Sequence, residues 1–304
     1  MNDAIAYING AFVPWETATV HLMSHSVARG SAIFEVIGFH SVPPGRVIFR
    51  LRDHVIRLFR TAELLDMKIP LSQEALCRAV IETLRHSRSQ EGMIKIVCYY
   101  SQIAFEVLPP RRTLDVAIFV IDPDLCGEEP GLSFDGGATL CISKWRKLDP
   151  QTVPIEAKVA ANYLNGMLAR DDACKRGFDF ALMLDTEGHI AEGATESIFL
   201  VQGKTLVTPA LGRVLDGITR RSILEAADAE GIESREGRLS SDFLFQAEEV
   251  FLSGTPKKLI PVKQIEDRHI KKTPGAVTKV LTQRMAAILK GADNRFKKWL
   301  TIVD

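Results

Sequence analysis

The sequence predicts an α+β fold with two domains. Segments with strand character outnumber helical segments and do not alternate strictly with them, which argues against a doubly wound parallel sheet. A length of 304 residues suggests about two domains. Residues 123–132 contain two prolines, two glycines and three acids without periodicity, as is typical of a linker. We therefore expect a small N-terminal α/β domain over residues 1–122, an interdomain linker over 123–132 and a larger C-terminal domain over 133–304.

The first domain is predicted to begin with a β-hairpin. Asn9-Gly10 lies between two short apolar runs, and both residues tolerate positive φ, so we expect a two-residue turn. Apolar residues at helical spacing predict helices over 53–67 and 72–86, with Ser72 as the N-cap of the second. Further strands are predicted at residues 34–40, 47–51, 93–100 and 114–121.

The second domain mixes strands and helices in the same way. Helices are predicted over 161–176, 217–230 and 275–290, and Gly177 and Gly231 end the first two, because glycine readily takes the left-handed conformation that follows a helix. Strands are predicted at residues 138–143, 178–185, 197–202, 205–208 and 249–253.

Composition limits the partners and the location. The 38 basic and 38 acidic side chains balance, which argues against nucleic acid as the main partner but leaves room for a small basic site for one phosphate group. No apolar run reaches the roughly 20 residues that span a membrane, and the N-terminus has no signal-peptide pattern. The five cysteines are scattered and odd in number, which fits reduced thiols in the cytoplasm. The seven histidines show no spacing typical of a metal site, so we expect no metal.

Lys158 lies among small and apolar residues, between Ala157 and Val159. A lysine in this setting either extends to the surface or is held inside, and the segment alone does not decide between the two. Burial would favour the neutral amine, which can form a Schiff base with a carbonyl group. The glycine-rich motif of dinucleotide-binding folds, the P-loop and the nucleophile elbow of hydrolases are all absent.

Three further segments carry weak signals. Glu192 lies between two predicted strands, where it is either an ordinary turn residue or the partner of a cationic ring nitrogen. Gly217 precedes a predicted helix, whose free N–H groups can hold an anion, although an ordinary capped helix has the same pattern. Ser253 and Thr255 end a strand, and their hydroxyls could join such an anion site. None of these signals is specific alone.

In this order, the segments together resemble the class IV, or fold-type IV, pyridoxal-phosphate-dependent aminotransferases. The resemblance is greatest to the branched-chain amino acid aminotransferases and runs nearly end to end. It implies a D-amino acid aminotransferase-like fold with a β-barrel-like C-terminal domain, a cofactor between the domains, and a homodimer or higher homo-oligomer. The stretches that carry it are 20–25, 34–35, 49–54, 57–58, 143–146, 157–158, 162–164, 192–194, 217–220 and 253–255.

The resemblance implies pyridoxal 5'-phosphate as the cofactor and gives the matching residues roles. Lys158 would bind the cofactor covalently and move a proton between the substrate Cα and the cofactor C4′. Glu192 would pair with the pyridine nitrogen and keep it protonated. The remaining implied contacts are Tyr163 at the phenolic oxygen, Leu215 on the ring face, and Arg57, Ile218, Thr219 and Thr255 at the phosphate. A phosphate role would account for Arg57 standing apart from the apolar face of its predicted helix.

The implied activity is ping-pong transamination between a branched-chain or other hydrophobic L-amino acid and a 2-oxo acid such as 2-oxoglutarate. The substrate half of the pattern departs from the family, which typically has tyrosine at Arg29 and Tyr-x-Arg where this chain has Met93-Ile94-Lys95. Lysine is not a faithful replacement for arginine, because it lacks the forked guanidinium. Arg29 could bind a carboxylate from a new direction instead. Arg111 and Arg112 lie where relatives place a loop that closes over the site, and they either bind a carboxylate there or are solvated. The candidate substrate residues are therefore Arg29, Phe34, Met93, Lys95 and Arg111.

Other activities remain open at this point. A D-amino acid or amine transaminase of the same fold is one alternative. A 4-amino-4-deoxychorismate lyase is less favoured, because such enzymes need a threonine where this chain has Val36. A protein that binds pyridoxal phosphate without turnover is a third, and the presence of Lys158, Glu192 and Arg57 speaks against it.

Overall fold

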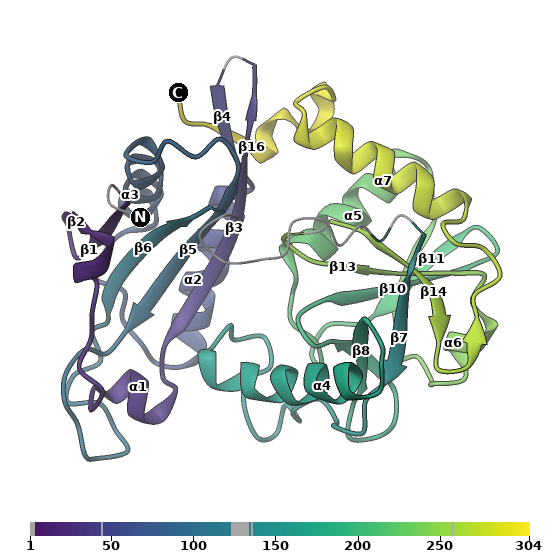
Figure 1. Ribbon diagram of the computed structural model, residues 1–304, viewed down its shortest axis with the longest axis horizontal. Helices are drawn as coiled ribbons and strands as arrows, with labels where there is room; N and C mark the ends of the chain where they lie inside the picture. The colour runs from purple at the N-terminus through teal and green to yellow at the C-terminus, as the bar shows by residue number, and fades with distance from the viewer. Residues whose placement is uncertain (1–3, 44, 123–133, 135, 257) are drawn as a thin grey trace. The chain divides into compact units, whose positions relative to one another are not determined.

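The computed structural model describes residues 4–304 except 44, 123–133, 135 and 257. The chain forms two compact units (Figure 1). Unit 1 comprises Met1–Pro130, Ala157–Ala161 and Leu289–Asp304, and unit 2 comprises Gly131–Glu156 and Asn162–Ile288. The expected linker, 123–132, lies outside the described residues.

The expected division into 1–122 and 133–304 differs from these units in two segments. Residues 157–161 and 289–304 belong to unit 1, although the sequence placed them in the second domain. The reason is pairing over long sequence distances: Val159 forms a β-bridge with Ile33, and Leu300 pairs with Phe49. Local patterns carry no information about such partners.

Unit 1 is built on a seven-stranded sheet in the order β16-β4-β3-β5-β6-β1-β2. All six neighbouring pairs are antiparallel, in agreement with the predicted α+β class. The strands are β1 (Ile5–Ile8), β2 (Ala11–Pro14), β3 (Ile33–Val42), β4 (Gly45–Phe49), β5 (Gly92–Tyr99), β6 (Asp115–Ile121) and β16 (Leu300–Ile302).

One face of this sheet packs against α2 (Leu51–Leu64) and α3 (Gln73–Arg85), which form one apolar core with it. Alternate residues of the strands point into that core, and Ile33 and Ile37 of β3 are fully buried there. The residues between them face the other way and are only partly buried, apart from Glu35, which shares the inward face. The short helix α1 (His25–Arg29) precedes β3 in the chain.

Two local predictions in unit 1 are confirmed. Asn9 and Gly10 have φ values of 49° and 99°, as the turn between β1 and β2 requires. Ser72 is the N-cap of α3, and its hydroxyl accepts a hydrogen bond from the Ala75 N–H (3.1 Å).

Unit 2 contains a nine-stranded mixed sheet in the order β12-β11-β10-β13-β14-β7-β8-β9, with β15 paired to β14. β9 also contacts β10 and β11, so the sheet curls into a partial barrel, as expected. The strands are β7 (Ala138–Ile142), β8 (Phe180–Leu184), β9 (Ile190–Gly193), β10 (Ser197–Gln202), β11 (Thr205–Pro209), β12 (Ser234–Gly237), β13 (Glu249–Ser253), β14 (Ile260–Ile265) and β15 (Arg268–His269).

Four helices accompany this sheet: α4 (Tyr163–Lys175), α5 (Ile218–Ala229), α6 (Phe243–Gln246) and α7 (Ala276–Leu289). Ala169 and Ala173 of α4 pack on Cys141 and Met183 of the sheet. The bounds of α4, α5 and α7 lie within two residues of the predicted ones. The sequence did not predict the short elements α1, α6, β9, β12, β14, β15 and β16.

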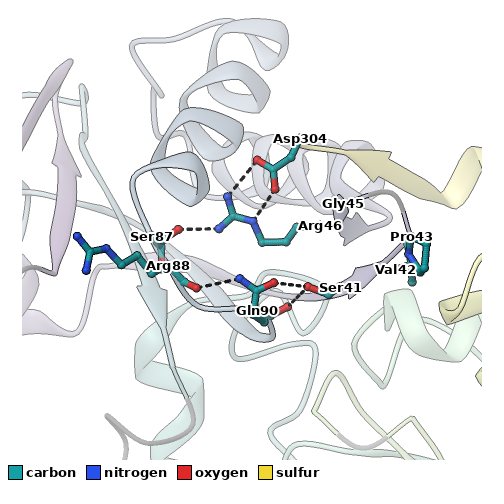
Figure 2. A pocket seen from close by; sticks show the side chains of 9 residues that line it. All are labelled: Ser41, Val42, Pro43, Gly45, Arg46, Ser87, Arg88, Gln90 and Asp304. Atoms are coloured by element: carbon teal, nitrogen blue, oxygen red, sulfur yellow. Dashed lines mark hydrogen bonds and ion pairs between the residues drawn. The ribbon is translucent and has the colours of Figure 1, made fainter.

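A cavity of about 780 Å³ lies where β3 runs into β4 in unit 1 (Figure 2). Arg46 donates to Asp304 from Nε (2.7 Å) and Nη2 (3.0 Å), and its Nη1 donates to the carbonyl oxygen of Ser87 (2.7 Å). The side-chain carboxylate of Asp304 therefore already neutralises the buried Arg46 guanidinium. The ion pair ties Asp304 to Arg46 of β4, and none of the candidate site residues lines the cavity.

Candidate active site

Backbone contacts hold Lys158 beside the start of β3. Its N–H donates to Thr61 Oγ1 (3.1 Å), and its carbonyl oxygen accepts from the Phe34 N–H (3.1 Å). The side chain reaches the Phe34 ring, with Nζ 4.8 Å from the ring centroid. Lys95 Nζ lies 5.6 Å from the same centroid. The structure therefore brings Lys158, Phe34 and Lys95 together within unit 1.

Lys95 is a half-buried cation in apolar surroundings. It lies opposite Val36 on β3 and Phe119 on β6. Among the residues described, no carboxylate lies within ion-pair distance of its ammonium. An ammonium that has lost part of its hydration gains from an anionic ligand, so this arrangement favours one here.

Arg57 is buried, which corrects the prediction that it lies off the inward face of its helix. Its Nε and Nη2 donate to the two carboxylate oxygens of Glu35 (both 2.7 Å), and His54 Nδ1 lies 2.7 Å from Glu35 Oε2. The reason is that Glu35 points into the core from β3 and needs a cation there. Arg57 also lies one helical turn from Thr61, so the helix carries it toward the Lys158 segment.

The Glu35 carboxylate is ionised despite its burial. Burial alone would raise the pKa of Glu35, but the Arg57 charge and the hydrogen bonds from His54 and Arg57 outweigh it and lower the pKa to about 2. The three side chains thus form one buried ionic cluster, Glu35–His54–Arg57, behind Phe34.

Glu192 is a strand residue rather than a turn residue, since it lies buried in β9. Lys147 Nζ lies 2.5 Å from Glu192 Oε1, and the Leu215 N–H donates to Oε2 over 3.4 Å. Tyr163 opens α4, and Gly166 on its first turn approaches Ala194 so closely that a Cβ would lie 2.4 Å from the Ala194 carbonyl oxygen. Unit 2 therefore brings Glu192, Leu215 and the helix that begins at Tyr163 together.

The start of α5 offers hydrogen-bond donors without acceptors of its own. Gly217 is the N-cap and has no side chain to bond the N–H groups of Ile218 and Thr219. Ser197 Oγ lies 3.1 Å from where a Cβ on Gly217 would be, and Ser197 pairs with Ser253 on the neighbouring strand. The buried Ser253 hydroxyl has no hydrogen-bond partner in the described part of the chain. The α5 N–H groups and the Ser253 hydroxyl, which is two residues from Thr255 in the chain, are suited to a phosphate group.

The other substrate candidates are less closely grouped. Arg29 ends α1, is exposed, and donates to the carbonyl oxygen of Phe105 (2.9 Å). Met93 lies on the same face of β5 as Lys95, two residues away. Arg111 lines a separate cavity of about 400 Å³ and has its nearest carboxylate in Asp115, 3.7 Å away.

Comparison with known proteins decides the family. A family model described as amino-transferase class IV matches residues 32–265, more than half of the chain. The chain belongs to the class IV aminotransferases. Branched-chain-amino-acid aminotransferases of Salmonella typhimurium and Escherichia coli are 33% and 32% identical to it over 302 residues, which cover 98% of this chain and 97% of each relative.

Solved structures agree with this membership. The branched-chain amino acid aminotransferase of Thermobaculum terrenum, solved in its PLP-form, matches this aminotransferase with a TM-score of 0.90 and 29% identity, over 100% of this chain and 99% of that one. The enzyme of Thermoproteus uzoniensis, solved with norvaline, matches with a TM-score of 0.92 and 30% identity over 99% of both chains. The fold-type IV architecture expected from the sequence is therefore confirmed.

The side chains of this aminotransferase fit pyridoxal 5'-phosphate. In unit 2, the start of α5 and the buried Ser253 hydroxyl suit the phosphate, and Glu192 suits a cationic ring nitrogen. In unit 1, Lys158 suits an aldehyde. None of the helices in the described ranges is long and apolar enough to cross a bilayer.

Sequence reasoning missed four residues that this aminotransferase places around the candidates. Glu35 could have been found, because alternation puts it on the same face as Ile33 and Ile37. Lys147 and Thr61 contact Glu192 and Lys158, which are far from them in the sequence, so no local pattern pointed to them. Lys258 donates to the Thr255 carbonyl oxygen (2.7 Å), and burial lowers the pKa of Lys258 to about 8.

Proposed function

We propose that this aminotransferase carries out pyridoxal-phosphate-dependent transamination between a branched-chain or other hydrophobic L-amino acid and a 2-oxo acid such as 2-oxoglutarate. The observation that carries the proposal is that the Lys158 and Lys95 side chains both reach the Phe34 ring, with Nζ 4.8 Å and 5.6 Å from its centroid. Full-length likeness to branched-chain-amino-acid aminotransferases supports the substrate class.

The chain's residues divide the chemical work. Bound pyridoxal phosphate supplies an electron sink that makes the substrate Cα–H acidic. The Lys158 amine takes the proton from Cα and delivers it to C4′. Glu192 holds a proton at the pyridine nitrogen. The remaining cofactor ligands in this proposal are Tyr163 at the phenolic oxygen, Leu215 on the ring, and Arg57, Ile218, Thr219 and Thr255 at the phosphate.

We assign recognition of a substrate carboxylate to Lys95. It has no carboxylate partner in the described residues, and it shares the Phe34 ring as a contact with the Lys158 side chain. Phe34 and Met93 would offer apolar surface beside it. Arg29 and Arg111 are also proposed to bind substrate. Each already has a partner within the chain, so both are weaker candidates than Lys95.

Replacing Lys95 with methionine is expected to raise the KM for 2-oxoglutarate about 10-fold or more, the cost of losing a charge-assisted hydrogen bond. Steady-state kinetics with leucine and 2-oxoglutarate would measure it. The exposed Lys68 provides the matched control, Lys68→Met, whose kinetics should not change. An equal rise in the KM for leucine would assign Lys95 to the α-carboxylate. Unchanged KM values for both substrates would contradict carboxylate binding by Lys95.

The proposed function is tested by the colour of the purified protein. With cofactor bound it should absorb near roughly 410–430 nm, and L-leucine or L-isoleucine should bleach this band as the amino group moves to the cofactor. The same half-reaction is then run with D-alanine and with simple amines. A protein that bleaches only with D-alanine or amines would refute the branched-chain assignment, and a protein that binds cofactor without bleaching would refute transamination.

We propose that the chain forms a homodimer through unit 1, because exposed apolar side chains gather on the surface of this unit. Leu22, Phe105 and Val107 are 80%, 77% and 76% exposed. The segments that carry them are joined by the Ser24–Ile103 bridge. Exposed apolar surface of this kind is typical of an interface between copies of a chain.

Sedimentation is therefore expected to give about twice the chain mass of 33.7 kDa. Phe105→Glu should shift the protein toward the monomer, whereas Val280→Glu, on an exposed apolar residue of α7, should not. A wild-type monomer at micromolar concentration would refute the homodimer. The expected cytoplasmic location remains a prediction.

A further inference from the structure

Lys147 makes the shortest contact to Glu192 in the described part of the chain. Its ammonium lies 2.5 Å from Glu192 Oε1, and the two side chains are only 14% and 9% exposed. An ion pair that is largely removed from water is screened little, so it acts more strongly on its partner than a surface pair does. The backbone also fixes this lysine, because the Lys147 N–H donates to the Leu184 carbonyl oxygen at the end of β8 (2.8 Å).

The pair leaves Glu192 with one oxygen for a further donor. Oε1 is taken by Lys147, whereas Oε2 accepts, from the residues described, a long contact from the Leu215 N–H (3.4 Å). A carboxylate oxygen accepts two hydrogen bonds, so Oε2 retains room for one more. Lys147 therefore determines that Oε2 of Glu192 is the oxygen left for a further donor, and it fixes the orientation of that oxygen.

Charged residues near this pair in the chain have partners of their own. Arg213 pairs with Asp185 (3.6 Å) and Asp149 (3.9 Å), and Arg221 pairs with Asp216 (3.3 Å). Glu196 accepts hydrogen bonds from the Thr195 N–H and hydroxyl. Lys147 and Glu192 thus form a neutral pair, and a protonated ring nitrogen would add a second cation to one carboxylate.

We propose that Lys147 is a positioning residue of the amino-transfer site, which aims Glu192 Oε2 at the pyridine nitrogen and weakens the hold of this carboxylate on the ring proton. The inference rests on the proposed role of Glu192 and adds a residue that the cofactor need not touch. One negative charge shared by two cations binds each less strongly than it would bind one. Lys147 also contributes a positive charge close to the ring, which disfavours further protonation of the bound cofactor.

The test is the pH titration of the visible band of the bound cofactor. Lys147→Met removes a positive charge near the ring, so the midpoint of the spectral change should move upward by about half a pH unit to one unit. Lys147→Gln should show the same upward shift and decides the matter if the methionine variant does not fold. Lys147→Arg, which keeps the charge, should stay within about 0.2 pH units of wild type.

Lys144→Met is the matched control, because Lys144 is exposed three residues earlier and the chemical change is the same. Its midpoint should equal that of the wild type. Neutral Lys147 variants with the wild-type midpoint but a lower melting temperature would show a merely structural role and overturn the proposal. A wild type without a visible band would instead overturn the proposed function, so the two failures are distinguishable.

Discussion

Replacing Lys158 with alanine is expected to abolish transamination, lowering kcat/KM by at least about 10³-fold. The reason is that the variant loses both the covalent attachment of the cofactor and the base that moves the Cα proton. The measurement is the steady-state rate with leucine and 2-oxoglutarate, together with the loss of the absorbance near roughly 410–430 nm.

The fold should survive this change. The contacts that anchor residue 158 to Thr61 and Phe34 are made by its backbone, which alanine retains, so the melting temperature should stay close to that of wild type. Lys279→Ala on the exposed face of α7 is the matched control and should be fully active. A Lys158→Ala variant that kept a tenth of the activity would show that another group is the base.

Replacing Glu35 with alanine is expected to lower the free energy of unfolding by about 3–5 kcal/mol. The substitution leaves Arg57 as a buried guanidinium without its bidentate partner and removes the acceptor of the His54 ring. Urea denaturation of the purified protein measures the effect. Glu63→Ala is the control, because Glu63 pairs with Arg60 at the surface, and such pairs contribute about 0–1 kcal/mol. A loss below about 1 kcal/mol for Glu35→Ala would contradict the view that the cluster supports the fold.

The Glu35 cluster also makes stability depend on acid pH. In the folded protein the pKa of Glu35 is about 2, whereas an unfolded glutamate has a pKa of about 4.3. Because the unfolded chain takes up the proton first, this stabilisation is present above about pH 5 and is lost as the pH falls toward 2. Unfolding measured at several pH values should show a steeper acid loss in wild type than in Glu35→Gln. Parallel curves would contradict this origin.

Local patterns predicted much of the fold but not its long-range pairings. The Asn9-Gly10 turn and the Ser72 cap follow from contacts within four residues, so sequence spacing was sufficient to find them. The β16–β4 pair joins residues about 250 positions apart, and nothing in either segment identifies its partner. The same limit moved residues 157–161 out of the unit expected for them.

The candidate site, like the fold, could be predicted only in part. Lys158, Glu192 and the start of α5 were predicted as site residues because they match a family pattern in order along the chain. The ion pairs that surround them were not, since Lys147 meets Glu192 only after β8 and β9 have paired. The family resemblance implied a phosphate role for Arg57, which stays a prediction, and its burial against Glu35 was missed because helical spacing alone placed it on the outer side.

The pairing of β16 with β4 constrains how this protein emerges from the ribosome. β4 is complete at Phe49, but its outer neighbour begins only at Leu300, the residue that pairs with Phe49. At 5–20 residues per second, translation of the intervening chain takes on the order of 10 to 50 seconds. During this time the outer edge of β4 has unpaired backbone groups, and Arg46 lacks the Asp304 carboxylate. The nascent first unit therefore exposes an aggregation-prone strand edge until residues 300–304 have been synthesised.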